Sequence, residues 1–444
     1  MPSQDFAESL LHGLGRQAAS VESVDEFAQS MLTKHPSALR MRWGLSQDDV
    51  DFPLRPIAWY RQGYESTDPS IRPSRQLSYA AGDYYLQDAG SMLAMAACET
   101  DQALPEGEAP LICDLCASPG GKATALLENL GGGFLLANEP IRSRLAPLAF
   151  NLARTGIPRY AISAMDPSDL ADQLGGVFDR VVVDAPCSGQ ALLGRGKQSL
   201  AALTQTQIEH SAARAQRILA AAVKLLRPGG KLVFSTCTFA EQENENQVDW
   251  MIDHCGMLAA PIDRLLPYES HHDSKCAYRL WPHRHQCAGS FAASLIAGFD
   301  VASEGVFRER KKKRKGKPSA TIPDAVAEIV DPASVRLKES EVILWGWPVD
   351  APAWVESVAE SGPELAYRTG QTWKPSHHLA RRRDLDHQAV FDVDADIAAK
   401  YLAGEAIACD QKGWLVVRHG NRGLGWIKAS GGTGKNHLPV SARS

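Results

Sequence analysis

A regular alternation of short apolar runs with amphipathic stretches, between residues 111 and 236, limits this chain to few folds. One run, residues 178–186, contains three consecutive valines, which is typical of a strand buried on both faces of a sheet. Residues 208–226 repeat apolar side chains at helical spacing and predict a long helix, and a further apolar run follows at 231–238. Strands that alternate with helices of this length predict a doubly wound, Rossmann-like α/β domain with a parallel sheet.

The remainder of the chain is long enough for further domains, because 444 residues exceed one typical hydrophobic core. Residues 1–85 combine a helical start with short extended segments and predict a small α+β domain. Residues 84–99 carry apolar side chains at helical spacing. We therefore expect a helix there that introduces the main domain, residues 86–302.

A dense run of lysine and arginine at 308–317 separates the main domain from the C-terminal part. It lies within a predicted linker, residues 303–325, and the C-terminal portion spans residues 326–444. Residues 413–439 are rich in glycine and tryptophan, so we expect a small β-rich module of short strands there. The formal net charge of −5 argues against binding nucleic acid over the whole surface, so any phosphate contacts must use local positive charge such as this run.

The number of cysteines and the composition of the N-terminus indicate the cellular compartment of the protein. Nine cysteines spread thinly over this length are no disulfide framework, so we expect reduced thiols. The N-terminus has acidic residues where a secretory signal would be basic, and no uninterrupted apolar segment reaches membrane-spanning length. We expect a cytoplasmic monomer without membrane contacts.

A glycine-rich loop leaves the first predicted strand of the main domain and opens a helix. The loop consists of Cys116, Ala117, Ser118, Pro119, Gly120, Gly121 and Lys122. Glycines let the backbone approach a ligand, and a helix N-terminus offers unpaired N–H groups. Glu139 ends the next predicted strand, where an acid in such folds accepts hydrogen bonds from ribose hydroxyls. This order predicts an adenosine-containing cofactor, with a tight turn as the alternative; a nicotinamide cofactor is disfavoured because G-x-G-x-x-G is absent.

Two cysteines follow two other predicted strands. Cys187 lies in the run Asp184 to Gly189, and Cys237 lies in the run Ser235 to Thr238. Ligands of open α/β sheets bind beyond the carboxyl ends of the strands, so both thiols should face the same crevice as the glycine-rich loop. A lone cysteine is more often a small buried hydrophobic residue. Two of them in polar turns at strand ends favour chemistry instead.

Methylation of carbon 5 of cytosine needs such residues, because that carbon is a poor nucleophile. A thiolate that adds to carbon 6 makes carbon 5 enamine-like and able to accept a methyl group. An acid such as Asp184 could hold the cytosine edge and stabilise the protonated adduct. From the residues alone, either cysteine could be the nucleophile, since DNA cytosine methyltransferases place theirs in a Pro-Cys motif.

Four motifs of the chain, CASPGGK, NEPIRSR, DAPCSG and STCTFAEQENENQVDWMI, resemble those of the Sun family of RNA (cytosine-5) methyltransferases. The resemblance runs over nearly the whole chain and includes a C-terminal extension with a PUA-like RNA-binding module. It implies methyl transfer from S-adenosyl-L-methionine to carbon 5 of cytosine through a covalent cysteine adduct. The bacterial subgroup that the chain resembles modifies 16S ribosomal RNA, so small-subunit ribosomal RNA is the expected partner.

The resemblance also implies roles for single residues. Cys237 corresponds to the nucleophile and Cys187 to the cysteine that assists product release. The positions that correspond to cofactor contacts are residues 116–122, Glu139, Arg144, Asp166 and Asp184. The segments 190–200 and 288–291 depart from the family pattern, but neither contains the two cysteines.

Several alternatives remain at this stage. The RNA could be a tRNA, or the chain could be a non-catalytic RNA-binding factor of ribosome assembly. The same cofactor fold could also methylate a protein or a small molecule, although transfer to nitrogen or oxygen needs no thiol. Two further sets of residues could serve a metal or a nucleic acid.

The first set, Cys276, His283, His285 and Cys287, consists of metal ligands by residue type but not by spacing, so no metal is expected. The second set, Trp373, Trp414 and Trp426, consists of candidates for base stacking, with packing the expected use of at least two.

Overall fold

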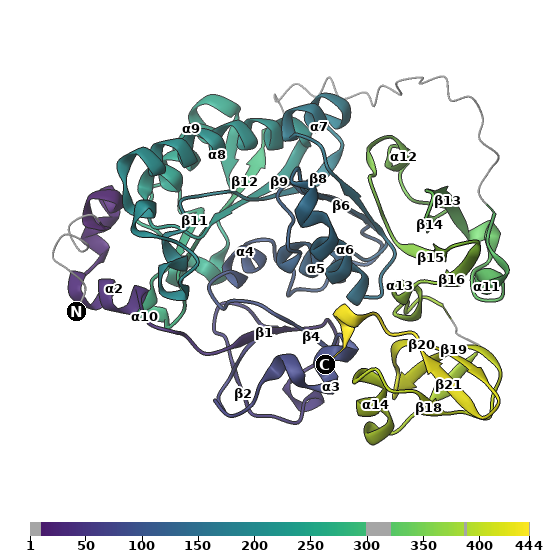
Figure 1. Cartoon of the computed structure of the whole chain (residues 1–444). Coiled ribbons are helices and arrows are strands. Elements are labelled where there is room, and N and C mark those ends of the chain that lie inside the picture. The colour runs from purple at the N-terminus through teal and green to yellow at the C-terminus, as the bar shows by residue number, and fades with distance from the viewer. Residues whose placement is uncertain (1–9, 299–320, 386–388, 444) are drawn as a thin grey trace.

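The main domain is built on an eight-stranded sheet in the computed structural model, which describes residues 10–298, 321–385 and 389–443 (Figure 1). The basic run 308–317 lies outside the described residues. The strands of this sheet are β5 (Leu111–Asp114), β6 (Phe134–Asn138), β7 (Tyr160–Ser163), β8 (Phe178–Asp184), β9 (Leu226–Thr236), β10 (Met257–Ala259), β11 (Ala277–Leu280) and β12 (Ser290–Ala297).

The order of these strands is β10-β12-β9-β8-β5-β6-β7, with β11 paired to β12. Strands β5 to β9 are parallel to their neighbours, and β12 runs antiparallel to β9. The chain moves outward from β5 through β6 to β7, then crosses back to β8 and β9. This topology confirms the doubly wound class and places the reversal of strand order between β5 and β8, where ligands bind in such sheets.

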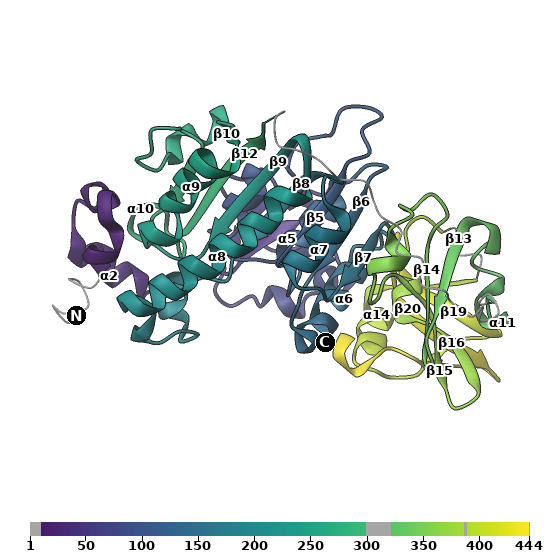
Figure 2. The same ribbon diagram turned by 90° about the horizontal axis from the view of Figure 1, so that it is seen from above.

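Helices cover both faces of the sheet, as Figures 1 and 2 show. One face carries α4 (Met92–Ala97), α5 (Gly121–Glu128) and α6 (Leu145–Arg154), and the other carries α7 (Pro167–Leu174), α8 (Gln205–Leu225) and α9 (Glu245–Cys255). The three valines explain the arrangement. Val181 and Val183 pack on the side of α7 and α8, whereas Val182 packs on the side of α4 and α5. The buried middle of this central strand therefore carries apolar side chains toward both faces.

The N-terminal part corrects one expectation, the helix over residues 84–99. Its first residues form strand β4 (Tyr84–Leu86), which pairs with β1 (Ala38–Met41), and the helix begins only at α4. Tyr84 is buried in the N-terminal sheet, so a cross-strand pair outweighs the helical spacing there. The other strands of that sheet are β2 (Leu54–Pro56) and β3 (Gly63–Ser66).

A short helical segment before this sheet packs on the main domain instead. It includes α2 (Val24–Met31), whose Phe27 contacts Phe239 and Trp281 edge to face. Arg16 forms an ion pair with Glu241, close to the end of β9. The N-terminal segment is thereby joined to the residues that follow Cys237.

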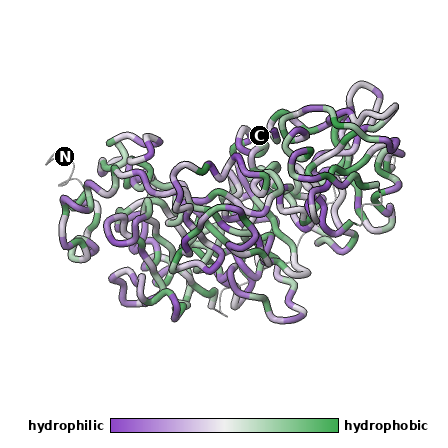
Figure 3. Tube along the Cα trace, turned by 90° about the horizontal axis from the view of Figure 1, so that it is seen from below, coloured by the Kyte–Doolittle hydropathy of each residue, from purple (hydrophilic) through white to green (hydrophobic). Residues whose placement is uncertain are grey.

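The C-terminal part contains two sheets rather than one. The first consists of β13 (Val335–Glu339), β14 (Ile343–Pro348), β15 (Glu364–Thr369) and β16 (Thr372–Pro375). The second consists of β17 (Val390–Asp392), β18 (Ile407–Ala408), β19 (Gly413–His419), β20 (Arg422–Ser430) and β21 (Thr433–Asn436). The second sheet confirms the expected β-rich module at 413–439. Hydrophobic and hydrophilic stretches alternate along the trace in all parts of the chain (Figure 3).

Tryptophans attach the first of these sheets to the main domain. Trp347 is fully buried, and its indole N–H donates to the Tyr160 carbonyl of β7 at 3.0 Å. Trp354 packs edge to face against Phe134 and Phe178, which belong to β6 and β8. The core of the main domain thus continues into the C-terminal part. No helix within the described residues is both long and apolar enough to span a membrane.

This contact predicts a measurable cost for Trp347→Ala. Removal of a fully buried indole should lower the free energy of unfolding by about 3–5 kcal/mol, measured by urea denaturation. Val349→Ala, at a largely exposed position two residues away, is the control and should change it by less than about 0.5 kcal/mol. Equal effects of the two changes would contradict the docking described here.

Candidate active site

The two predicted cysteines lie next to each other. Parallel pairing of β8 with β9 sets Asp184 opposite Ser235, so the loops that follow the two strands leave the sheet side by side. Cys187 Sγ and Cys237 Sγ are 3.4 Å apart, although fifty residues separate them in the chain. Both side chains are partly exposed, and both thiols are free. The site therefore presents a pair of sulfur atoms in contact at the carboxyl edge of the sheet.

A buried carboxylate joins the two loops. Glu243 accepts hydrogen bonds from the Ser188 backbone N–H at 2.7 Å and from the Ser188 hydroxyl at 2.5 Å. Thr238, next to Cys237, lies 2.8 Å from the same hydroxyl and donates to Glu243 at 3.4 Å. Burial raises the pKa of Glu243 above its usual value, against the effect of these hydrogen bonds. The same carboxylate, that of Glu243, thus holds the residue that follows each of the two cysteines.

Polar side chains further along also hold the turn after Cys237. Asn244 donates to the Thr238 carbonyl at 3.0 Å. Glu245 and Arg279 form a fully buried ion pair at 2.6 Å, and Arg279 also donates to the Phe239 carbonyl at 3.1 Å. A buried pair of this kind is costly to break on one side, because the remaining charge is left without a partner. These contacts fix the path of residues 237–245.

An ion pair lies beside the thiols. Lys122 Nζ is 2.8 Å from Asp184 Oδ2, and the Ser235 hydroxyl donates to Asp184 Oδ1 at 2.8 Å. Burial alone would lower the pKa of Lys122, but Asp184 outweighs burial and raises it, with smaller contributions from Asp114 and Cys237. The ammonium therefore stays charged at this edge of the sheet.

The glycine-rich loop is connected to Glu139 through Arg144. Arg144 lies 3.0 Å from Glu139 Oε2 and donates to the Ser118 carbonyl at 2.6 Å. Gly120 has a φ of 116°, and a Cβ there would lie 3.1 Å from the Cβ of Asn151, so both backbone and space require glycine. Glu139 is buried, and the Ile141 backbone N–H also donates to it. The loop and the acid expected from the sequence thus form one hydrogen-bonded unit.

Asp114, at the end of β5, was missed by the sequence analysis. It is almost completely buried, and its Oδ2 has no hydrogen-bond partner among the described residues. Burial raises its pKa to about 7, although Lys122 opposes the shift. A buried acceptor without a partner points to a donor that the described residues do not supply. The available signal was a single acid that ends an apolar run just before the glycine-rich loop.

Asp166 and Cys116 occupy the same edge of the sheet with other contacts. Asp166 follows β7, is exposed, and accepts from the Ser168 N–H as the N-cap of α7. Burial raises the pKa of Cys116, which therefore stays a thiol. Among the described residues, no group of three or more His, Cys, Asp or Glu side chains is arranged to hold a metal ion.

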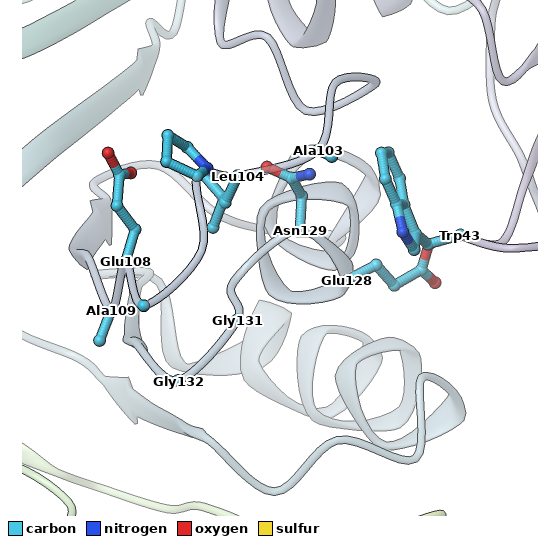
Figure 4. A pocket seen from close by; sticks show the side chains of 11 residues that line it. Trp43, Ala103, Leu104, Glu108, Ala109, Glu128, Asn129, Gly131 and Gly132 are labelled. Atoms are coloured by element: carbon cyan, nitrogen blue, oxygen red, sulfur yellow. The ribbon is translucent and has the colours of Figure 1, made fainter.

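Figure 4 shows a hollow of about 490 Å³, which contains none of these residues and which Trp43 of the N-terminal part also lines. It is formed by the loop before β5 and the loop between α5 and β6, at the amino ends of those strands. Its acids are Glu108 and Glu128, and Glu128 pairs with the buried Arg40. It holds no nucleophile, so the candidate site remains the opposite edge of the sheet.

Two family models match the chain. The model described as 16S rRNA methyltransferase RsmB/F matches residues 102–296, and the model described as methyltransferase RsmF PUA domain matches residues 388–444. Together they cover more than half of the chain. The first match includes the glycine-rich loop and both cysteines, and the second includes the β-rich module.

Individual relatives and solved structures agree with these matches. Ribosomal RNA small subunit methyltransferase F from Erwinia tasmaniensis is 28% identical, over 87% of this chain and 84% of that protein. The protein of the same name from Aeromonas salmonicida is 27% identical, over 97% and 96%. A methyltransferase homologue from Pyrococcus horikoshii has a TM-score of 0.55 and 24% identity, over 67% of this chain and 100% of that one. NSun6 from Pyrococcus horikoshii with SFG, an S-adenosylmethionine analogue, has a TM-score of 0.54 and 20% identity, over 66% and 98%.

The role of Glu243 predicts the effect of Glu243→Gln. The amide must point its NH₂ group at the Ser188 donors or at Thr238, so one buried donor loses its acceptor. The free energy of unfolding should fall by about 1–3 kcal/mol, measured by urea denaturation. Glu106→Gln makes the same change at an exposed position and should have little effect. An unchanged stability of the Glu243 variant would contradict the role of this carboxylate as a link between the loops.

The raised pKa of Asp114 predicts a pH-dependent stability. With a folded pKa of about 7 and an ordinary value of 3.8, the folded chain holds more protons than the unfolded chain between these values. Stability therefore falls as pH rises through this window, by up to about 1.4 kcal/mol per pH unit. Asp114→Asn removes this dependence. Urea unfolding of both proteins at pH 5 and 7 should show the variant gaining relative to the wild type; a constant difference would mean that Asp114 is already ionised at pH 5.

Proposed function

We propose that this chain, which belongs to the 16S rRNA methyltransferase RsmB/F family, transfers a methyl group from S-adenosylmethionine to carbon 5 of a cytosine in small-subunit ribosomal RNA. The observation that carries the proposal is the contact between the two thiols at 3.4 Å. Relatives named ribosomal RNA small subunit methyltransferase F support the choice of RNA. The PUA-domain match at the C-terminus supports an RNA partner as well.

The residues at the carboxyl edge of β5 to β8 fit S-adenosylmethionine, which when bound supplies an electrophilic methyl group. Glu139 is placed to accept hydrogen bonds from ribose hydroxyls, as acids at this position do in doubly wound folds. The unpartnered Oδ2 of Asp114 offers a buried acceptor beside the glycine-rich loop. Asp166, which follows β7 as the N-cap of α7, offers an exposed carboxylate. Residues 116–122 and Arg144 shape the loop between them.

Cys237 is the proposed nucleophile. Its sulfur would add to carbon 6 of the cytosine, and the electron pair that this addition places on the ring makes carbon 5 reactive toward the methyl group. Lys122 keeps its positive charge at this edge of the sheet, where it is paired with Asp184. Asp184 is held by Lys122 and Ser235 and would accept the hydrogens of the cytosine edge. The target base must leave its stack to reach this position.

Cys187 is the proposed aid to product release. Its hydrogen bond with Cys237, together with burial, raises its pKa well above the usual value, so Cys187 keeps its proton when Cys237 is a thiolate. After methyl transfer, a base removes the proton from carbon 5, the bond between carbon 6 and sulfur breaks, and the ring regains its double bond. The Cys187 S–H can then donate to the departing Cys237 sulfur and make it a better leaving group.

Two alternatives are less well supported. A non-catalytic assembly factor would have no need for two adjoining thiols beside a charged lysine. Transfer to nitrogen or oxygen, as on a protein or small molecule, requires no sulfur nucleophile. A tRNA substrate would use the same site, so ribosomal RNA is favoured by the description of the family model and by the names of the relatives.

The different roles of the thiols predict opposite behaviour of two variants. Cys237→Ala should lower methyl transfer to RNA on the order of a thousandfold or more and form no covalent complex. Cys187→Ala should accumulate an RNA-linked protein band on a denaturing gel when S-adenosylmethionine and total RNA are present. Cys255→Ala, at a partly exposed thiol at the end of α9, should behave like the wild type. A band that depends on Cys187 rather than Cys237 would reverse the roles.

A further inference from the structure

A second hollow lies between the two C-terminal sheets and is unexplained by the thiol chemistry. Its volume is about 750 Å³. It is lined by Thr321, Ile322, Pro323, Asp324, Ala325, Gln371, Thr372, Trp373, Lys374, Trp414, Lys428, Lys435 and His437. One side comes from residues 321–325 and from β16 with the turn before it, in segments that neither family match covers, and the other side comes from β19 to β21 and His437. We call it the inter-sheet groove.

The inter-sheet groove is positively charged, although the whole chain carries a formal charge of −5. Lys374, Lys428 and Lys435 have no carboxylate ion-pair partner within the ranges that the structure describes, and one acid, Asp324, lies on the lining. Burial, together with smaller contributions from the three lysines, lowers the pKa of His437 to about 4, so its imidazole is neutral. Local charge of this kind attracts polyanions.

Aromatic rings lie among these lysines. Trp373 and Trp414 are only partly buried, and each has a cation against its ring, Arg368 at 5.4 Å and Lys428 at 5.6 Å from the centroid. Trp426 differs, because it is buried in the core and donates to the Ser376 carbonyl. Packing is thus the plain use of Trp426 alone, whereas Trp373 and Trp414 pack against the same core only in part and line the groove.

We propose that the inter-sheet groove binds a single-stranded segment of the RNA substrate, with bases against Trp373 and Trp414 and phosphates near Lys428 and Lys435. Alternating cations and aromatic rings are the pattern by which proteins hold single-stranded nucleic acid without reading its sequence. An acidic peptide would match the charge but would leave the rings unused. This inference rests on the proposed function and adds a second RNA contact to it, which holds the substrate while the thiols act.

The test uses the full chain and a fluorescein-labelled single-stranded RNA in anisotropy titrations at several salt concentrations. The double change Lys428→Gln and Lys435→Gln should raise Kd roughly tenfold and reduce the slope of log Kd against log salt by about 1.4, since each phosphate contact on a single strand contributes about 0.7. Trp373→Leu should raise Kd roughly 5- to 150-fold. The matched control is Lys400→Gln with Lys412→Gln, two exposed lysines of the same module, and it should change neither quantity.

The outcomes separate this inference from the proposed function. Cys237→Ala should bind RNA as the wild type does, and the groove variants should raise KM for RNA with kcat unchanged. If the wild type binds RNA through the groove but transfers no methyl group, the proposal that the groove binds RNA stands and the proposed function fails. A Kd and a salt slope like those of the wild type for the lysine variant, with unaltered thermal stability, would overturn the proposal that the groove binds RNA. Competition by polyglutamate as effective as that by RNA would also overturn it and indicate an acidic protein partner.

Discussion

The parallel register between β8 and β9 is the constraint on which the candidate site depends. It places Asp184 opposite Ser235, and from that pairing the two following loops can bring Cys187 and Cys237 into contact. The strands come from segments about fifty residues apart, joined by the long helix α8, so the contact is a product of the fold rather than of local sequence. A shift of register would separate the thiols and also remove the acid from their vicinity.

The polar residues behind the thiols keep that geometry. Glu243 links the loops, and the buried pair of Glu245 with Arg279 fixes the turn after Cys237. Lys122, at the end of the glycine-rich loop, forms an ion pair with Asp184. The proposed site for the cofactor and the proposed site for the target cytosine therefore share this ion pair. Such side chains act through the residues that do chemistry, because a reacting sulfur must be held within about 0.5 Å of its productive position.

Much of this arrangement could be predicted from the sequence, because it follows from local patterns. The triple-valine strand, the glycine-rich loop and the residues at strand ends are visible in short windows, and a doubly wound sheet brings strand ends together. Asp114 and Glu243 were missed, since their roles depend on burial and on partners far along the chain. The strand at 84–86 was read as helix because pairing with β1 is a tertiary contact. The separate first C-terminal sheet and the inter-sheet groove likewise depend on docking that no window shows.

The most direct test of the central claim follows the hydrogen on carbon 5. Small-subunit ribosomal RNA labelled with tritium at carbon 5 of its cytosines would be incubated with the protein and S-adenosylmethionine, and tritium in water and methyl groups in RNA would be counted together. A thiol-assisted transfer to carbon 5 predicts one tritium released for each methyl group gained. Methyl transfer with the tritium retained would place the methyl group on nitrogen or on the ribose and contradict the account.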